Sequence, residues 1–447
     1  MGREEGPPAA SAGLMDEVLA LCRELIRVDT TNPAGNETLA AEILQDYLSS
    51  AGVECQLVAR EPGRANLVAR LAGVGSGPSL AFVGHTDVVP ADARDWTHPP
   101  FEAVVDDDGF LYGRGAVDMK NEVAARAVAL ARLARSGFRP SGDLWFLAVA
   151  DEEDGSADVG MRWLLETRRD IRPDLSLNEG GGVRLDLADG RRVSTFAMGE
   201  KGTYPVRVTA VGEAGHASVP DLGDNAVPHL GELLRRVGRG RAAGRPGPVV
   251  DGMLSVLVGY RPGDDLASAI ERAAELHPML RHALWPLTGT TMAPTVLAAS
   301  RKRNVMPARA SVELDCRILP GTTEDDVERE VRTRLGDELH YELSWPERLV
   351  PGSVSPAEGE LYDVCQAFLD DTDAGTMLLP SLCTGYTDSA YLRAAAGTTA
   401  YGFSPIATTP AEVVETGYHN ADERIHVDDL VLATQFHEFV ARRLLGD

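Results

Sequence analysis

Histidine and acidic residues follow several apolar segments of this 447-residue sequence, in types and spacings suited to metal binding. The first such cluster, Gly84-His85-Thr86-Asp87, comes directly after the apolar segment Leu80 to Val83. A neutral imidazole is a common metal ligand, and an acidic residue two positions later can accept its second N–H and fix the tautomer. The H-x-D pattern alone is equally consistent with a histidine that caps the end of a strand.

Further acidic clusters lie along the chain. Asp118 lies in Gly113 to Lys120, whose glycines permit close approach of the backbone before a helix, although an N-cap aspartate is common at such a place. Asp151-Glu152-Glu153-Asp154 follows the apolar segment Leu144 to Ala150. A run of four carboxylates is most often a solvated acidic turn. Each cluster alone therefore has an ordinary structural explanation.

Together, these clusters supply the donors of a paired metal site. Two more members are Glu179, at the end of a short apolar segment, and His419, in Gly417 to Glu423. Two histidines and three carboxylates, one of them bridging, suit two zinc-like ions, and one carboxylate is left over to act as a base. Since sites in open α/β sheets form at the carboxyl ends of strands, we expect these residues to converge.

The apolar patterning predicts the elements that must position this cluster. A chain of this length favours two domains. Strands and helices alternate in the first 180 residues, which indicates an α/β layer with a largely parallel sheet. The predicted strands cover 55–59, 66–71, 80–83, 144–150 and 175–178, and the predicted helices cover 15–51 with a break at 30–33, 121–136 and 159–168.

A different pattern begins near Gly199. The predicted order is β-α-β-β-α-β, that of a ferredoxin-like α+β domain, over 204–211, 225–237, 295–299, 311–318, 323–335 and 339–344. The segment 241–291 is an excursion whose form the pattern does not predict. We therefore expect a flexible tail over 1–13, a catalytic domain over 14–198 and 347–447, and a small domain inserted over 199–346.

Charge and cysteine content limit the partners and the compartment. The chain has 43 basic and 68 acidic residues, a net charge of −25, and so acidic a surface repels nucleic acid. No apolar segment is long enough to cross a bilayer, and residues 1–13 lack the apolar core of a signal peptide. Five widely spaced cysteines without a C-x-x-C pair are typical of a reduced, cytoplasmic protein. We expect neither a nucleic-acid nor a membrane partner.

The chain resembles the M20 family of metallopeptidases, which includes aminoacylase-1, the succinyl-diaminopimelate desuccinylases, acetylornithine deacetylase and glutamate carboxypeptidase. The G-H-x-D, G-R-G-x-x-D-M-K and D-E-E motifs carry the resemblance, which extends from Arg27 to Ile425. The excursion resembles the carboxypeptidase S and N-fatty-acyl-amino-acid hydrolase branch. Two divalent ions are implied, zinc first and cobalt or manganese as alternatives. The implied ligands are His85, Asp118 and Glu179 for one ion and Asp118, Glu153 and His419 for the other, with Asp118 bridging.

The same resemblance implies the catalytic roles. Asp87 would orient His85, and Glu152 would be the general base that takes a proton from water and returns it to the leaving amine. His216, in Gly215-His216-Ala217-Ser218, would stabilise the oxyanion from the partner subunit of a homodimer formed through the inserted domain, which also serves as a lid. A cis peptide bond between Asp118 and Met119 is also implied.

Substrate binding is implied for two residues of the inserted domain. Asn304 and Arg317 would bind the carboxylate end of the substrate, although Arg317 could instead pair with Asp315. Asp388 matches a family motif without an assigned role. The other histidines belong to no cluster and are expected to be surface or packed residues: His98, His229, His277, His282, His340, His426 and His437.

The resemblance thus implies an amidohydrolase that cleaves N-acyl amino acids or dipeptide-like small molecules ending in a free carboxylate. A dipeptidase or aminopeptidase of the same family is the alternative, and Glu179 favours the deacylase because several aminopeptidases carry aspartate there. A non-catalytic binder of amino-acid derivatives would lack the base or a ligand, yet Glu152 and all five ligands are present. A serine hydrolase is a third interpretation, but the chain has no G-x-S-x-G elbow to support it.

Overall fold

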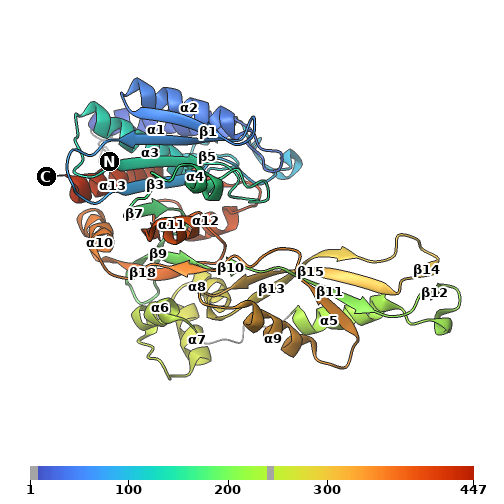
Figure 1. Cartoon of the computed structure of the whole chain (residues 1–447). Coiled ribbons are helices and arrows are strands. Elements are labelled where there is room, and N and C mark those ends of the chain that lie inside the picture. Colours follow the sequence, from blue (N-terminus) through green and yellow to red (C-terminus); the bar gives the residue numbers. More distant parts are fainter. Residues whose placement is uncertain (1–8, 239–245, 447) are drawn as a thin grey trace. The chain divides into compact units, whose positions relative to one another are not determined.

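The computed structural model describes residues 9–238 and 246–446, which form two compact units. The first unit comprises 9–198, 355–381 and 387–446, and the second comprises 199–354 with its gap and 382–386. Each unit thus combines segments that are distant in sequence, as the colours of Figure 1 show. Within the described residues, no helix is long and apolar enough to cross a membrane.

The first unit is built on a large mixed sheet whose centre is parallel. The strands follow one another in the order β1 (Glu54–Ala59), β2 (Ala65–Leu71), β6 (Leu144–Val149), β3 (Leu80–His85), β7 (Leu175–Asn178), β19 (Thr399–Gly402) and β9 (Arg192–Glu200). Strands β6, β3, β7 and β19 pair in parallel, whereas β1, β2 and β9 pair antiparallel at the two sides. This arrangement confirms the predicted α/β class and its mostly parallel central sheet.

Shorter strands complete this sheet beside β9. They are β8 (Arg184–Asp186), β18 (Thr376–Cys383) and β17 (Ser353–Val354), the last of which pairs with Gly199 and Glu200 of β9 and belongs to the second unit. A separate small sheet contains β4 (Val104–Val105), β5 (Phe110–Tyr112) and β20 (Arg424–His426). The pairing of β20 with β5 brings the segment after His419 against the segment before Asp118.

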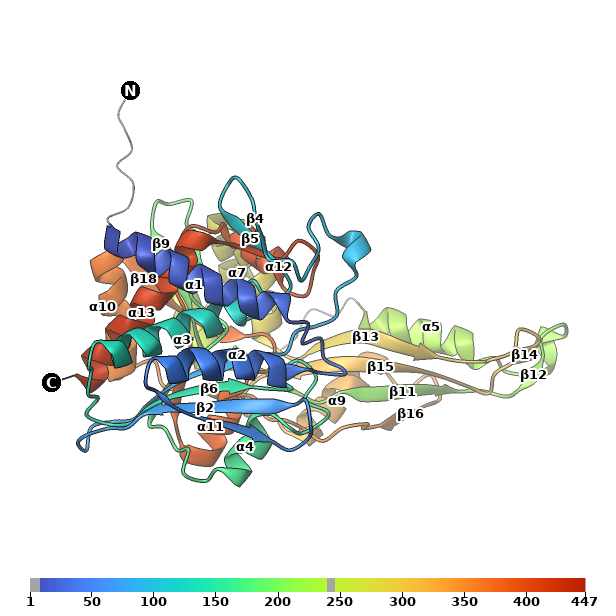
Figure 2. The same ribbon diagram turned by 90° about the horizontal axis from the view of Figure 1, so that it is seen from above.

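Helices cover both faces of the first unit's sheet, which explains why every residue of β3 and β6 is buried. One face carries α1 (Ala9–Arg27), α2 (Glu37–Ser50), α3 (Lys120–Arg135), α10 (Glu360–Thr372) and α13 (Val427–Leu445). The other face carries α4 (Met161–Thr167) and α11 (Ser389–Ala396), which Figure 2 shows on the opposite side of β2 and β6. Helix α12 (Ala411–Gly417) precedes His419.

The beginning of α1 differs from the predicted tail over 1–13. Residues 1–8 lie outside the described part of the chain, but α1 already begins at Ala9. The segment Ala9-Ala10-Ser11-Ala12 is rich in alanine, which has the highest helix propensity of all residues. The amphipathic pattern that starts at Leu14 therefore extends one turn further toward the N-terminus.

The second unit is an α+β sandwich. Its elements follow the order β11 (Val206–Val211), α5 (Ala226–Val237), β13 (Thr291–Ala298), β15 (Arg309–Ile318), α9 (Glu324–Leu335) and β16 (Tyr341–Ser344). The sheet has the antiparallel order β13-β15-β11-β16, with β10 (Gly202–Thr203) also on β15. Burial alternates strictly along β15, and its buried residues form one core with α5 and α9. The β-α-β-β-α-β order is thus present.

Helices form most of the excursion between α5 and β13. Residues 239–245 of this segment lie outside the described part. The remainder contains α6 (Pro248–Val258), α7 (Leu266–Leu276), α8 (Pro278–Ala283) and a 3-10 turn over Trp285–Thr288. At another point of this unit, the short strand β12 (Gly215–His216) pairs with β14 (Val305–Met306).

Candidate active site

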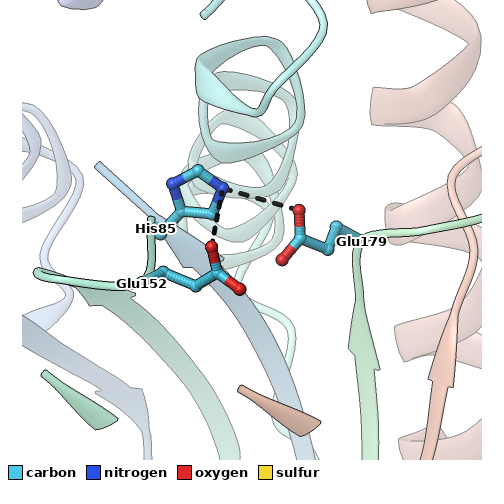
Figure 3. A group of neighbouring side chains, drawn as sticks. All are labelled: His85, Glu152 and Glu179. Atoms are coloured by element: carbon cyan, nitrogen blue, oxygen red, sulfur yellow. Dashed lines mark ion pairs between the residues drawn. The ribbon is translucent and has the colours of Figure 1, made fainter. Parts of the chain in front are cut away.

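The carboxyl ends of three adjacent parallel strands bring together the first group of predicted site residues. His85 is the last residue of β3, Glu179 directly follows β7, and Glu152 comes three residues after β6. Strand β3 lies between β6 and β7, so these side chains must converge. Figure 3 shows the His85, Glu152 and Glu179 side chains turned toward one another.

His85 Nε2 faces a set of carboxylate oxygens. It lies 3.0 Å from Asp118 Oδ1, 3.5 Å from Glu179 Oε2 and 4.0 Å from Glu152 Oε2, the last two marked in Figure 3. Asp118 reaches this point from the turn before α3, and its peptide bond to Met119 is cis, as the resemblance implied. Three carboxylates thus surround one imidazole nitrogen.

The second oxygen of Asp118 faces the second histidine. His419 Nε2 lies 3.3 Å from Asp118 Oδ2 and 3.1 Å from Glu153 Oε2. Asp118 therefore stands between His85 and His419 with one oxygen toward each. This is the arrangement expected of a carboxylate that bridges two ions.

Asp87 connects the His85 strand to the acidic loop after β6. Its Oδ1 accepts a hydrogen bond from the Glu152 amide at 3.2 Å, and its Oδ2 accepts one from the Glu153 amide at 3.1 Å. His85 Nδ1 lies 3.0 Å from the Asp87 carbonyl oxygen but 3.6 Å from its carboxylate. The contact that fixes the His85 tautomer is therefore chiefly to the backbone of Asp87, while the carboxylate positions the loop.

Two residues that the sequence-based interpretation gave no role also support the cluster. Asn32 Nδ2 donates to Asp87 Oδ2 at 3.0 Å and to Asp151 Oδ1 at 3.1 Å. The fully buried Glu423 accepts from the backbone amide of Asp118 at 2.9 Å. Asn32 and Glu423 lie near the two ends of the family resemblance, which extends from Arg27 to Ile425, and this is the signal that could have identified them.

The electrostatics of the cluster follow from burial and close opposite charges. Burial raises the pKa of Glu152, and the Glu179 carboxylate adds to this effect. Burial lowers the pKa of His85, but Glu179 and Asp118 outweigh it and raise that pKa well above its usual value. Hydrogen bonds to Asp118 and Glu153 raise the pKa of His419 to about 10. The site therefore holds an excess of negative charge that favours cations.

The donor set fits divalent metal ions. The buried oxygens Glu153 Oε1 and Glu179 Oε1 have no hydrogen-bond partner within the described residues. Two groups of donors, His85 with Glu152 and Glu179, and His85 with Asp118 and Glu153, each lie within 4.8 Å of one another. Imidazole nitrogen and carboxylate oxygen are ligands that zinc and related ions accept.

His216 and Asn304 lie together in the second unit. His216 is exposed in β12 and pairs with Val305, the neighbour of the exposed Asn304. The Ser218 amide donates to His216 Nδ1 at 3.2 Å, so the ring proton of a neutral His216 is on Nε2.

Arg317 and Asp388 lie in different units. Arg317 Nε donates to Asp315 Oδ2 at 3.0 Å, which is the alternative pairing considered for this residue. Asp388, at the N-terminus of α11 in the first unit, is 4% exposed. Burial raises its pKa well above the usual value, and the Glu179 charge adds to this effect, whereas His85 opposes it.

Comparison with known proteins shows consistent similarities over nearly the whole chain. A family model described as peptidase family M20/M25/M40 matches residues 81–443. A succinyl-diaminopimelate desuccinylase from Alkalilimnicola ehrlichii is 30% identical over 97% of this chain and 100% of its own. Human aminoacylase-1 is 27% identical over 91% of this chain and 90% of its own.

Solved structures share the fold at low sequence identity. The M20 family metallo-carboxypeptidase Sso-CP2 from Sulfolobus solfataricus has a TM-score of 0.72 and 17% identity, and the similarity covers 96% of this chain and 99% of that one. The di-peptidase Dug1p from Saccharomyces cerevisiae has a TM-score of 0.68 and 14% identity, with 97% of each chain covered.

Proposed function

The chain belongs to peptidase family M20/M25/M40, and from this premise we propose that it is a two-metal amidohydrolase that cleaves N-acyl amino acids or dipeptide-like substrates ending in a free carboxylate. Membership makes the chain an enzyme of a metal-dependent amidohydrolase and peptidase family that acts on small molecules. The observation that carries the proposal is the position of Asp118 between His85 and His419.

We assign the metal ligands as the family resemblance implies, and the contacts of Asp118 with His85 and His419 support this assignment. His85, Asp118 and Glu179 would hold one ion, and Asp118, Glu153 and His419 would hold the other. Zinc is the ion we propose, with cobalt and manganese as alternatives. When bound, such a pair of ions polarises the substrate carbonyl and makes water acidic enough to react near neutral pH.

Glu152 is the proposed general base. Its Oε2 lies 4.0 Å from His85 Nε2, whereas the carboxylate oxygens of Glu179 and Asp118 lie closer to that nitrogen, at 3.5 and 3.0 Å. It takes a proton from the attacking water and gives it to the departing amine nitrogen, so that the C–N bond breaks with a neutral leaving group. Asp87 positions the Glu152 backbone and contacts His85, which supports its proposed orienting role.

Residues 199–346, which form most of the second unit, are the proposed lid and dimerisation domain, inserted between catalytic segments over 14–198 and 347–447. The contact with Ser218 supports a donor role for His216, because it leaves an Nε2–H free to stabilise an oxyanion. We propose that His216 acts in the partner subunit of a homodimer. Asn304 and Arg317 are the proposed carboxylate-binding residues; the bond from Arg317 Nε to Asp315 leaves the Nη groups for this purpose.

The similarity to a desuccinylase and an aminoacylase supports deacylation of an N-acyl amino acid as the reaction. The dipeptidase alternative is favoured by the fold shared with a yeast di-peptidase, which at 14% identity is weaker support. The cytoplasmic location remains a prediction, based on five widely spaced cysteines without a C-x-x-C pair.

A substrate panel tests the proposal directly. Metal-reconstituted protein would be assayed with N-acyl amino acids of graded chain length and with free dipeptides, before and after removal of metal with a chelator. We expect chelator-sensitive cleavage of the acylated compounds. Cleavage of free dipeptides alone would contradict the deacylase assignment, and chelator-resistant cleavage would contradict the metal mechanism.

A further inference from the structure

A buried arginine lies behind the strand ends that carry His85 and Glu179. Arg126, in α3, has no exposed surface. Its Nη1 donates to the Val83 carbonyl, and its Nη2 donates to the Asn178 carbonyl at 3.0 Å. The same Nη2 also pairs with Glu122, which balances the buried positive charge. The guanidinium therefore donates its hydrogen bonds to groups in the protein interior.

The two carbonyls lie where β3 and β7 separate. Pairing between these strands runs from Leu80–Leu175 to Phe82–Leu177, whereas β3 continues to pair with β6 as far as His85–Val149. Val83 and Asn178 are the next residues on β3 and β7. The guanidinium therefore connects β3 and β7 at the first residues beyond their last backbone pairing. Because its N–H groups form a rigid planar fork, it fixes the separation of the two carbonyls.

This separation bears directly on the candidate active site. Val83 lies two residues before His85, and Asn178 lies immediately before Glu179. The distance of 3.5 Å between His85 Nε2 and Glu179 Oε2 depends on how far apart these two backbone segments stand. A side chain at Gly84 would meet Val123 Cγ2 at 2.7 Å, so the glycine allows α3 to approach closely enough for Arg126 to reach both strands.

His437, in α13, holds the guanidinium from the other side. It is fully buried, and its Nε2 accepts a hydrogen bond from Arg126 Nε at 3.1 Å. Its Nδ1 lies 2.6 Å from the Ala433 carbonyl, which can only accept. The ring is therefore neutral, with its proton on Nδ1 and a free acceptor at Nε2. The fork of Arg126 is thus fixed at three of its nitrogens.

We propose that Arg126 is a positioning residue, held by His437, that sets the separation of His85 and Glu179 and thereby builds the first of the two metal sites. The inference rests on the proposed function, because it needs these two residues to be ligands of one ion. The proposed role concerns only the first metal site. Among the described residues, Arg126 makes no hydrogen bond to the segments that carry Glu153 and His419.

Zinc titration of metal-free protein tests this inference. Arg126→Met should bind zinc at the His85–Glu179 site about 10–100-fold more weakly, the usual effect of losing an outer-shell partner, and should keep the affinity of the other site. Arg393→Met is the matched control. Arg393 also donates to carbonyls of two neighbouring strands, Met198 and Ala400, and neither strand end bears a proposed ligand. The Arg393→Met variant should bind zinc at both sites with the affinity of the wild-type protein.

The outcomes separate this inference from the proposed function. Fewer than two zinc ions on the wild-type protein would contradict the two-metal proposal itself. Two ions on wild type and unchanged affinities in Arg126→Met would overturn only the positioning role. If Arg126→Met does not fold, the comparison moves to His437→Leu, which should weaken the first site, and His437→Gln, which retains an acceptor and should restore it. Equal affinities in these two variants would also overturn the inference.

Discussion

Glu423 Oε1 accepts a hydrogen bond from the backbone amide of Asp118 at 2.9 Å, although more than 300 residues separate the two in sequence. The same carboxylate accepts from the Val117 amide at 2.7 Å and from Arg114 Nη1 at 2.7 Å. Glu423 lies four residues after His419. It therefore ties the loop of one proposed ligand to the loop of the bridging carboxylate.

We expect Glu423→Gln to weaken metal binding. An amide can present only one oxygen to these donors, and its NH2 group would face backbone N–H groups, so the Asp118 loop should move. Zinc affinity should fall about 10–100-fold, as is usual for outer-shell changes, measured by titration calorimetry. Asp422→Asn is a matched control, because Asp422 accepts from Thr97 on an exposed loop. Equal loss in both variants would contradict the specific role of Glu423.

Glu152→Gln should lose turnover but retain both metal ions. The amide preserves the size of the side chain and cannot take a proton, and general-base catalysis is typically worth about 10²- to 10⁴-fold. The measurements are kcat and the zinc content of the purified variant. Asp154→Asn, on the exposed side of the same loop, should leave kcat unchanged. A Glu152→Gln variant with full, chelator-sensitive activity would exclude Glu152 as the base.

His216→Ala should also lose turnover, about 10²- to 10³-fold, because an oxyanion donor disappears while the proposed ligands stay. A mixture of inactive His216→Ala and Glu152→Gln subunits should regain activity if His216 serves the partner's site. If the two variants form dimers at random, about a quarter of all active sites would then combine an unaltered Glu152 with an unaltered His216. Mixing His229→Ala, another histidine of the second unit, with Glu152→Gln provides the control. If subunit exchange is verified and activity does not return, His216 acts in the site of its own subunit or has no role in catalysis.

The convergence of His85 and Glu179 was predictable from a rule that is visible in the sequence. His85 and Glu179 come directly after apolar segments, and the carboxyl ends of parallel strands share one edge of a sheet. The excursion carried a signal as well, since Val250, Met253, Leu254 and Leu257 recur at helical spacing and are buried in α6. The prolines and glycines around this segment obscure its helical spacing.

The residues that hold the ligands were harder to predict. Arg126 and His437 are single polar residues on helices far apart in sequence, and they acquire a role only when α3 packs against α13. From the sequence, His437 was expected to be a surface or packed residue, and it is fully buried. Its bond to Arg126 depends on tertiary contact, which periodicity does not report.

The neutral state of His437 makes a last prediction about pH. Burial lowers the pKa of His437 well below its usual value, and the neighbouring Arg126 charge acts in the same direction. In the unfolded chain the same histidine has a pKa of about 6.5, so below this pH the unfolded state binds a proton that the folded state does not. The free energy of unfolding should therefore fall as the pH drops below about 6.5.

Comparison with His437→Gln isolates this effect from that of the many carboxylates. Glutamine retains an acceptor for Arg126 but does not titrate. Between pH 7.5 and pH 5, the wild-type protein should lose more unfolding free energy than the variant, by at most about 1.4 kcal/mol for each pH unit below the unfolded-state pKa. Urea unfolding of the metal-free proteins at both pH values measures the difference. Parallel losses in the two proteins would show that His437 accepts a proton in the folded state, contrary to its position between Arg126 and the Ala433 carbonyl.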